Sequence, residues 1–320
     1  MALETTTTSA NDVVNDSLIQ PTIIPALSER PGLAVRVCRE FNGIGQPTKA
    51  LKIPRVSSYW GSPADRGAGV DDEFDGAEGS AQGNTQFVTD GVTINTPEYC
   101  IAHAVTDNVQ EDSVIDGAEF LSLITGTMLQ VHQLALDDDF CALFSGLSNS
   151  VGTTNTDMSI ANGLDATHGI IKRGANCDAM EYVLDPEQVA NIRTAVLSTN
   201  AAAAIYAASA DRLINYGRTD GATRGMGRVM TLDGCLVTMS GLCDTDGGGV
   251  DVLGAAFCPS TAQNDASGAT TFGIGWKRLP RLEQQRQAKG RSTDIVMSMR
   301  AGLAELQDGS GTLIETDAPA

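Results

Sequence analysis

Three adjacent carboxylates, Asp137, Asp138 and Asp139, are the densest group of potential metal ligands in the sequence. A divalent cation would relieve the repulsion between these like charges. The segment has a helical pattern, however, and consecutive helical residues point about 100° apart, so the three side chains cannot converge on one ion. The cluster is therefore predicted to be a solvated helix face, or to pair with arginines of another subunit, rather than to bind a metal.

A second acidic group resembles the opening of a calcium-binding loop. Asp244, Asp246 and Asp251 lie in a glycine-rich segment, but the twelfth position of the loop would be Ala255. An EF-hand needs a bidentate Glu at that position. The segment is therefore predicted to be a surface turn, and no metal ligand is assigned in the sequence.

The sequence lacks the motifs of the large enzyme classes. It has no phosphate-binding loop, no His-Glu-x-x-His, no Gly-x-Ser-x-Gly and no Cys/His zinc ribbon. Gly225-Met-Gly227 and Gly273-Ile-Gly275 are fragments of a dinucleotide fingerprint without its third glycine. His103, His132 and His168 have no evident nucleophile partner, and His132 is expected to be structural. We therefore expect no enzyme activity, no catalytic residue and no cofactor.

One basic segment stands out in an acidic chain. The sequence has 21 Lys and Arg against 40 Asp and Glu, a formal net charge of -19, which should repel nucleic acid. The cations of the basic segment are Lys277, Arg278, Arg281, Arg286, Lys289, Arg291 and Arg300. An acidic segment carries Asp65, Asp71, Asp72, Glu73, Asp75 and Glu78. We hypothesise that the two segments pair between subunits of a symmetric assembly, while DNA contact by the basic segment, or no role, stays open.

The composition is typical of a folded chain in a reducing compartment. Hydrophobic residues make up 42% of the 320 residues, enough for one large core or two modest ones. The seven cysteines are odd in number and never arranged as Cys-x-x-Cys, so we expect reduced thiols. The N-terminus lacks the pattern of a secretion signal, and no apolar run approaches the roughly 20 residues of a membrane span.

Hydrophobic periodicity predicts an α+β protein whose N-terminal half contains a hairpin and a long helix. About thirty polar and Pro-punctuated residues predict an extended arm, and strands at 50–56 and 86–95 predict a hairpin around the loop 59–85. A strand at 99–105 precedes a helix from about 120 to 144. Its predicted core-facing residues are Phe120, Ile124, Met128, Val131 and Ala135.

The second half of the chain has a weaker pattern. Residues 153–176 show no clear periodicity, and a strand at 180–184 leads into a helix with Pro186 in its first turn. Further strands are predicted at 229–239, 250–257, 271–276, 295–299 and 312–314.

The order of these parts resembles the Hong Kong 97-like capsid fold of tailed bacteriophages. The resemblance rests on Ile94-Asn-Thr-Pro-Glu-Tyr-Cys-Ile101, on Gln110-Glu-Asp-Ser113 before a long helix, and on the acidic helix end Leu136-Asp-Asp-Asp-Phe140. It implies an N-terminal arm (1–45), an extended hairpin loop (46–96) and a peripheral domain with the spine helix (97–178). It further implies an axial domain (179–272) and peripheral return strands (273–320).

The resemblance implies a major capsid protein that self-assembles as pentamers and hexamers into an icosahedral shell around double-stranded DNA. Implied partners are further copies of the chain, a separate scaffold protein, a portal, a possible decoration protein and packaged DNA in loose non-specific proximity. The implied location is the virion capsid, with the host cytoplasm before assembly and no membrane. The sequence has no lysine between Lys52 and Lys172, so covalent crosslinking through the hairpin loop is not expected. The alternatives are an encapsulin-like compartment and a cytosolic hydrolase or cation-dependent enzyme that uses Asp137–Asp139.

Overall fold

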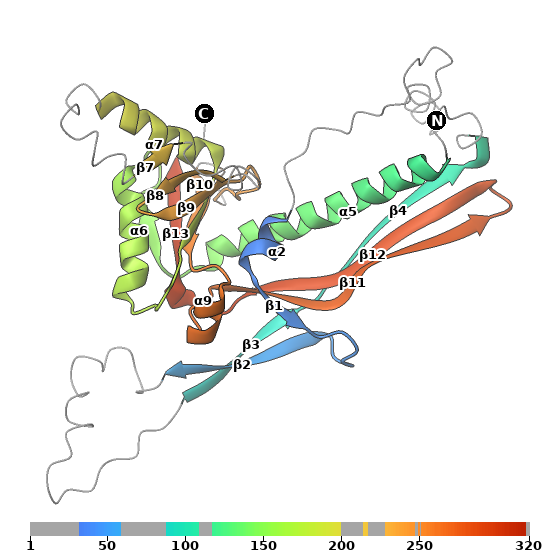
Figure 1. Ribbon diagram of the computed structural model, residues 1–320, viewed down its shortest axis with the longest axis horizontal. Coiled ribbons are helices and arrows are strands. Elements are labelled where there is room, and N and C mark those ends of the chain that lie inside the picture. The colour runs from blue at the N-terminus through green and yellow to red at the C-terminus, as the bar shows by residue number, and fades with distance from the viewer. Residues whose placement is uncertain are drawn as a thin grey trace, which may run out of the picture.

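The computed structural model describes residues 32–58, 88–108, 117–199, 214–216, 228–246, 249 and 251–317. The molecule has an elongated half and a compact half, and a two-stranded hairpin projects from the elongated half (Figure 1). The mixed helix and sheet content confirms the α+β prediction.

The elongated half is a four-stranded sheet with the order β1-β11-β12-β4, covered by one long helix. Its elements are β1 (Arg39–Asn42), β4 (Glu98–Thr106), α5 (Gly117–Ala142), β11 (Phe272–Gln287) and β12 (Ser292–Glu305). β12 pairs antiparallel with both β11 and β4, and β1 pairs parallel with β11. Because α5 has 26 residues, it is about 39 Å long and runs beside β4 and β12 (Figure 1).

The compact half is a seven-stranded sheet with the order β5-β13-β10-β6-β9-β8-β7. Its strands are β5 (Ser150–Gly152), β6 (Glu181–Leu184), β7 (Ile214–Tyr216), β8 (Arg228–Leu232), β9 (Cys235–Met239), β10 (Asp251–Phe257) and β13 (Gly311–Asp317). The other elements near this sheet are η2 (Leu143–Gly146), α6 (Ile160–Lys172), α7 (Pro186–Thr199), α9 (Ala262–Ser267) and η3 (Asp308–Ser310).

The central strands of the compact half are buried on both faces. In β6, Tyr182 and Leu184 pack in one core cluster with residues of α6 and α7, whereas Val183 packs in the other. All seven residues of β10 are buried. Continuous apolar runs without alternation are typical of strands covered on both sides.

The two halves share a core of aromatic rings. Phe140 of α5, Phe144 of η2, Phe257 of β10 and Phe272 of β11 are fully buried. Their ring centroids lie 5.1 to 6.3 Å apart, and several pairs are edge-to-face. The end of the long helix is therefore fixed between both sheets.

The predicted hairpin is present. β2 (Ala50–Ser58) pairs antiparallel with β3 (Val88–Asn95) in a two-stranded sheet of its own. The predicted loop 59–85 lies outside the described residues.

The long helix is present, but one of its predicted core residues is wrong. Met128 is buried and Ile124 is partly buried against β4 and β12, whereas Val131 is 46% exposed. His132 takes the inward position instead, because the buried row follows a four-residue spacing through Met128, His132, Leu136 and Phe140. The side chain of Phe120 lies outside the described part of the chain.

Three local features differ from the sequence predictions. Residues 160–172 of the weakly patterned region form α6, which is capped at its N-terminus by the Ser159 hydroxyl. The predicted single strand 229–239 is a hairpin, because Asp233 and Gly234 both have positive φ and form its turn. In the expected N-terminal arm, residues 33–42 form α2 (Leu33–Val37) and β1, which are packed in the structure.

Residues 273–320, predicted as one set of return strands, contribute strands to both sheets. β11 and β12 lie in the four-stranded sheet, but β13 pairs with β10 in the seven-stranded sheet. Every residue of β13 from Gly311 to Ile314 is buried. Burial between β10 and β5 places this strand in the compact half.

Candidate interaction surfaces

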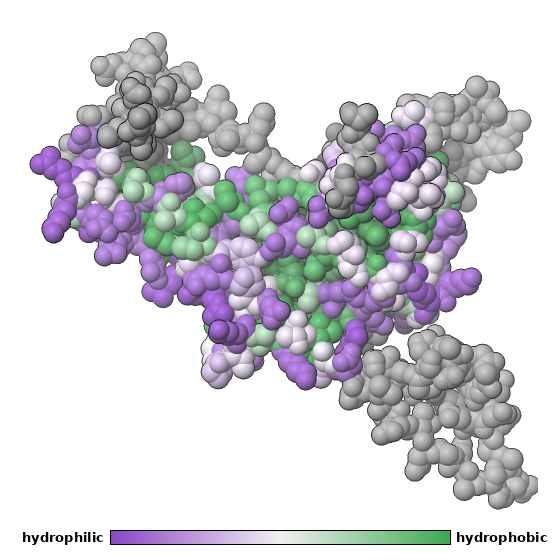
Figure 2. Space-filling view, turned by 180° about the vertical axis from the view of Figure 1, so that it is seen from behind, coloured by the Kyte–Doolittle hydropathy of each residue, from purple (hydrophilic) through white to green (hydrophobic). Residues whose placement is uncertain are grey.

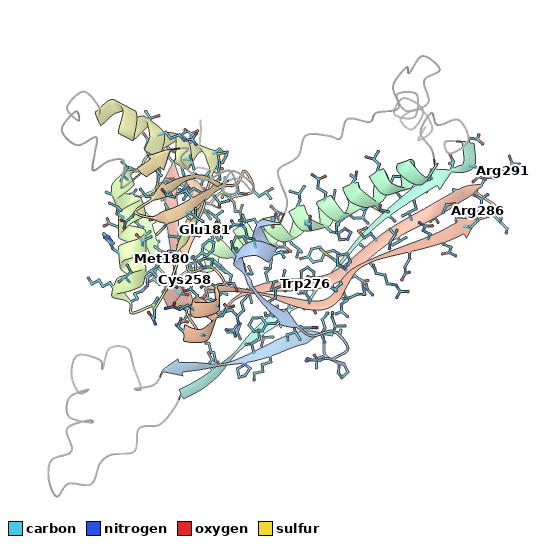
Figure 3. The ribbon with its side chains drawn as sticks, viewed as in Figure 1. Met180, Glu181, Cys258, Trp276, Arg286 and Arg291 are labelled. Atoms are coloured by element: carbon cyan, nitrogen blue, oxygen red, sulfur yellow. A yellow bond between two sulfur atoms is a disulfide. The ribbon has the colours of Figure 1, made fainter. Side chains whose placement is uncertain are left out.

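The far end of the elongated half, where β11 turns into β12, carries the cations Arg286, Lys289 and Arg291. Arg286 of β11 forms two hydrogen bonds with the Asp107 carboxylate, one of them 2.6 Å long. This contact with Arg286 holds the pKa of Asp107 below its usual value, and the charge of Arg291 lowers it further. Arg286 and Arg291 lie together at this tip (Figure 3). The Asp107 carboxylate is thus bound by Arg286, and Arg291 at the same tip forms no ion pair among the described residues.

Most other cations of the basic segment have partners within the subunit. Lys277 is 8% exposed, and its ammonium group donates to the Gln46 carbonyl oxygen at 2.7 Å. Arg278 forms an ion pair with Glu98 of β4. The remaining described contacts are those of Arg281 with Glu283 and of Arg300 with the Thr96 carbonyl oxygen.

These partners bear on the pairing hypothesis. Arg281, Lys289 and Arg291 are exposed and remain accessible to a second molecule, whereas Lys277 is held inside the subunit. Their hypothesised partners Asp65, Asp71, Asp72, Glu73, Asp75 and Glu78 lie outside the described residues. The pairing therefore stays a prediction.

Exposed apolar side chains accompany these charges. From Leu279 to Gln287, every residue of β11 is exposed, including Leu279 at 54%. Leu129 and Val131 of α5 are exposed as well. Figure 2 shows hydrophobic surface interspersed with hydrophilic surface on the elongated half. An outer strand with so little intramolecular cover is typical of a surface that meets another protein.

The predicted acidic cluster has a different role from the one expected. Asp137 is 2% exposed and accepts hydrogen bonds of 2.7 Å from the backbone N–H groups of Gly32 and Ala34. It thus caps the N-terminus of α2 from near the C-terminal end of α5. Burial raises the pKa of Asp137, and these backbone N–H groups oppose the rise. The prediction of a fully solvated face is wrong for Asp137, since its carboxylate accepts hydrogen bonds from backbone N–H groups at the start of a second helix, α2.

The neighbouring carboxylates do not converge with Asp137. Asp139 accepts a hydrogen bond from the Tyr99 hydroxyl, and Asp138 is exposed. His132 is buried, and its Nδ1 lies 2.8 Å from the Met128 carbonyl oxygen, a structural role as predicted. In the described ranges, no group of three or more His, Cys, Asp or Glu side chains could hold a metal ion.

The predicted surface turn is partly buried. Asp251 is 1% exposed and accepts a 2.7 Å hydrogen bond from the Asn155 N–H, while its own N–H donates to the Asp246 carboxylate. Asp244 accepts from the Thr245 N–H. These carboxylates organise the turn and the start of β10.

A buried ion pair joins the N-terminal elements to the compact half. Arg36 of α2 donates from both terminal nitrogens to the Glu181 carboxylate of β6, and one of them also donates to the Thr238 hydroxyl at 3.1 Å. The Thr238 hydroxyl in turn donates to Glu181 at 2.6 Å. The bidentate geometry fixes α2 against β6 and β9. No sequence signal pairs Arg36 with a carboxylate 145 residues away.

The expectation that all cysteines are reduced is contradicted. Cys177, after α6, forms a disulfide with Cys258 at the end of β10, with Cα atoms 5.9 Å apart. The bond lies within the compact half, beside Met180 (Figure 3). Among the free cysteines, Cys100 is exposed and Cys38, Cys141, Cys235 and Cys243 are buried.

Comparisons with known proteins separate sequence from fold. The chain matches no protein-family model and no curated protein sequence. Within its described residues, no helix is long and apolar enough to cross a membrane. Solved structures, in contrast, match over almost the whole chain.

Three of these structures, two phage capsids and one encapsulin, illustrate how similar the folds are at low sequence identity. The capsid of Ralstonia phage GP4 superposes with a TM-score of 0.64 at 9% identity, covering 96% of this chain and 97% of that one. The capsid of Cyanophage P-SCSP1u gives 0.61 at 12% identity, with 97% and 94% covered. The SrpI encapsulin of Synechococcus elongatus PCC 7942 gives 0.62 at 10% identity, with 97% and 95% covered. The long helix, the hairpin and the two sheets thus make up the Hong Kong 97-like capsid fold, as the sequence resemblance implied.

Proposed function

We propose that this chain is the major capsid protein of a tailed bacteriophage, which assembles with copies of itself into an icosahedral shell around double-stranded DNA. The observation that carries the proposal is the superposition on phage capsid proteins over more than nine tenths of both chains. The role of the chain is structural, and pentamers and hexamers are the proposed assembly units.

The shape of the subunit supports this proposal. A strand exposed from Leu279 to Gln287 gains little from its own subunit, but a neighbour can cover it in a shell. We propose that the compact half forms the axial lobe of each ring and that the hairpin crosses an adjacent subunit. Contacts between unlike surfaces of identical subunits close into rings, which can tile a shell.

Electrostatics support the enclosure of DNA. A net charge of -19 on each of many copies would give a surface from which a duplex is repelled. Packaged DNA would then stay in loose, non-specific proximity and move freely during packaging. We propose a portal and a separate scaffold protein as further partners, a decoration protein as an optional one, and the host cytoplasm as the place of assembly.

The pairing of the acidic segment 65–78 with the basic segment forms part of this proposal. The exposed cations Lys289 and Arg291 are its best candidates, because Arg278, Arg281 and Arg286 already contact Glu98, Glu283 and Asp107. Rim charges of this kind contribute mainly to orientation and specificity.

Electron microscopy of the purified protein tests the proposal. Expression of the chain, alone or with the scaffold protein of its source, should give closed shells with five-fold and six-fold rings. A protein that stays monomeric, or forms only open sheets, under conditions that preserve its fold would contradict it.

The encapsulin match supports an alternative compartment that holds proteins. Particles isolated from the natural source separate the two proposals. A capsid should contain double-stranded DNA that nuclease cannot reach, whereas an encapsulin-like shell should contain a cargo protein and no protected DNA.

A further inference from the structure

Two glycines face each other at the point where the hairpin meets the elongated half. Gly275 of β11 and Gly302 of β12 are direct partners in the antiparallel register, and both are buried. Residues opposite each other in such a pair project to the same face of the sheet. The absence of both side chains therefore leaves a flat surface over Gly275 and Gly302, which we call the seat of the hairpin.

The base of the hairpin fills this seat. Leu51 of β2 and Ile94 of β3 are direct partners in the hairpin register, and both are buried. A Cβ atom at Gly275 would lie 2.7 Å from the Leu51 Cδ1 and 3.2 Å from the Ile94 Cγ2. A Cβ atom at Gly302 would overlap the carbonyl oxygen of Asn95. One glycine thus accommodates side chains of the hairpin, and the other accommodates its backbone.

Polar contacts surround the same seat. The Lys277 ammonium group donates to the Gln46 carbonyl oxygen and to the Thr48 hydroxyl, just before β2. Arg300 donates to the Thr96 carbonyl oxygen, and the Thr96 hydroxyl donates to the Lys49 carbonyl oxygen at 2.8 Å. Both strands of the hairpin are therefore held at their base.

The outward part of the hairpin has fewer supports. In the described part of the chain, β2 and β3 form a sheet of their own, and Arg55 reaches back to the Leu306 carbonyl oxygen. Nine residues of β2 extend about 30 Å at 3.3 Å per residue. A tilt of about 10° at the seat would therefore displace the far end by about 5 Å, more than the tolerance of a packed interface.

We propose that Gly275 and Gly302 are positioning residues for assembly, because this opposed pair sets the direction in which the hairpin leaves the subunit. The inference rests on the proposed shell function for its consequence, but the hairpin direction itself is a property of the single subunit. Close packing also explains the glycine two residues earlier in Gly273-Ile-Gly275, since a Cβ atom at Gly273 would lie 2.9 Å from the Phe41 ring. These glycines provide close approach between strands.

The test combines assembly with a distance inside the subunit. Spin labels at Ser58→Cys, at the far end of β2, and at the exposed Gln284→Cys, in a Cys100→Ser background, report the angle between hairpin and sheet. Gly302→Ala should shift that distance by several ångströms and lower the yield of closed shells at least tenfold. Gly126→Ala and Gly309→Ala are matched controls, since a Cβ atom at either position meets nothing within 4 Å. They should behave as wild type.

A second pair of variants uses the difference between the two glycines. Gly275→Ala should impair assembly, and adding Leu51→Ala should restore it, because the obstacle is a side chain. The same addition should not rescue Gly302→Ala, whose obstacle is backbone.

The outcomes separate the two proposals. If wild type forms no shells, the shell function fails, but the label distance still tests the seat. An unchanged distance and normal shells for Gly302→Ala would overturn the seat. If Gly302→Ala does not fold, the Gly275→Ala variants decide. Restored assembly on adding Leu51→Ala supports the seat. Normal assembly of Gly275→Ala alone, or impaired assembly that Leu51→Ala does not restore, overturns it.

Discussion

The compact half and the elongated half differ in how far their side chains are buried and where their polar groups find partners. In the compact half, all of β10 is buried and polar groups find internal partners, as when the fully buried Gln188 amide donates to the Ile314 carbonyl oxygen and the Thr316 hydroxyl. In the elongated half, the outer part of β11 is exposed and its ion pairs lie at the surface. The first half stabilises the subunit, whereas the second presents groups that only a neighbour can cover.

Truncation at the shared aromatic core should have the largest effect. Phe140→Ala removes a buried ring that contacts three others, so the free energy of unfolding should fall by about 3–5 kcal/mol. Val131→Ala, on the exposed side of the same helix, should change it by less than about 0.5 kcal/mol. Urea denaturation of the unassembled subunit measures both. Equal effects would mean that the inward face of α5 has been misidentified.

Breaking the disulfide should weaken the compact half next. The bond closes a loop between residues 81 positions apart, so Cys177→Ala should lower the free energy of unfolding by about 2–4 kcal/mol. Thermal unfolding with and without reductant provides the check. The difference between wild type and variant should vanish in reductant, and a difference that persists would show that packing rather than the bond carries the effect.

Two aspartates should respond to pH in opposite directions. The pKa of Asp107 is lowered by Arg286 from its ordinary 3.8, so its stabilising contribution is present above that pH and is lost as the pH falls through the lowered value. The pKa of Asp137 is raised by burial, so its contribution is greatest below pH 3.8 and is lost as the pH rises through the raised value. Acidification should therefore shrink the stability difference between wild type and Asp107→Asn.

The same acidification should shift the difference between wild type and Asp137→Asn in favour of wild type. Urea midpoints from about pH 3 to 7 measure both differences. Shifts of the same sign for the two aspartates would contradict the contrast between a surface ion pair and a buried cap.

Charge reversal at the proposed interface should have the smallest effect per residue. Exposed ion pairs contribute about 0.2–1 kcal/mol each, and salt near 1 M shortens the Debye length to about 3 Å, so shells should loosen there. Asp71→Lys, Asp72→Lys and Glu73→Lys together should impair assembly. Lys289→Glu and Arg291→Glu should partly restore it, without breaking the contacts of Arg278, Arg281 and Arg286 with Glu98, Glu283 and Asp107. A combined variant that assembles no better than either parent would leave packaged DNA as the next partner to test.

Local sequence determined the elements that repeat a short pattern. The hairpin strands, the long helix that ends at Ala142 and the helix that begins at Pro186 follow from hydrophobic period and from Gly and Pro positions. The order of these elements was also sufficient to indicate the capsid fold. α6 was missed although its buried residues Gly163, Ala166, Thr167 and Ile170 recur at helical spacing and Ser159 is a recognisable N-cap, because only Ile170 among them has a large apolar side chain. The Asp233-Gly234 turn was a readable signal that divides the predicted strand 229–239.

The tertiary structure alone decided which distant residues meet. Asp137 caps α2, Arg36 binds Glu181, Cys177 reaches Cys258 and Gly275 faces Gly302, and none of these pairs follows a local period. The same holds for the basic segment, where Arg278 and Arg286 find Glu98 and Asp107 about 180 residues earlier in the chain. The physical reason is that local propensity acts over a few residues, whereas register, burial on both faces and close approach are set only when the two sheets pack against each other.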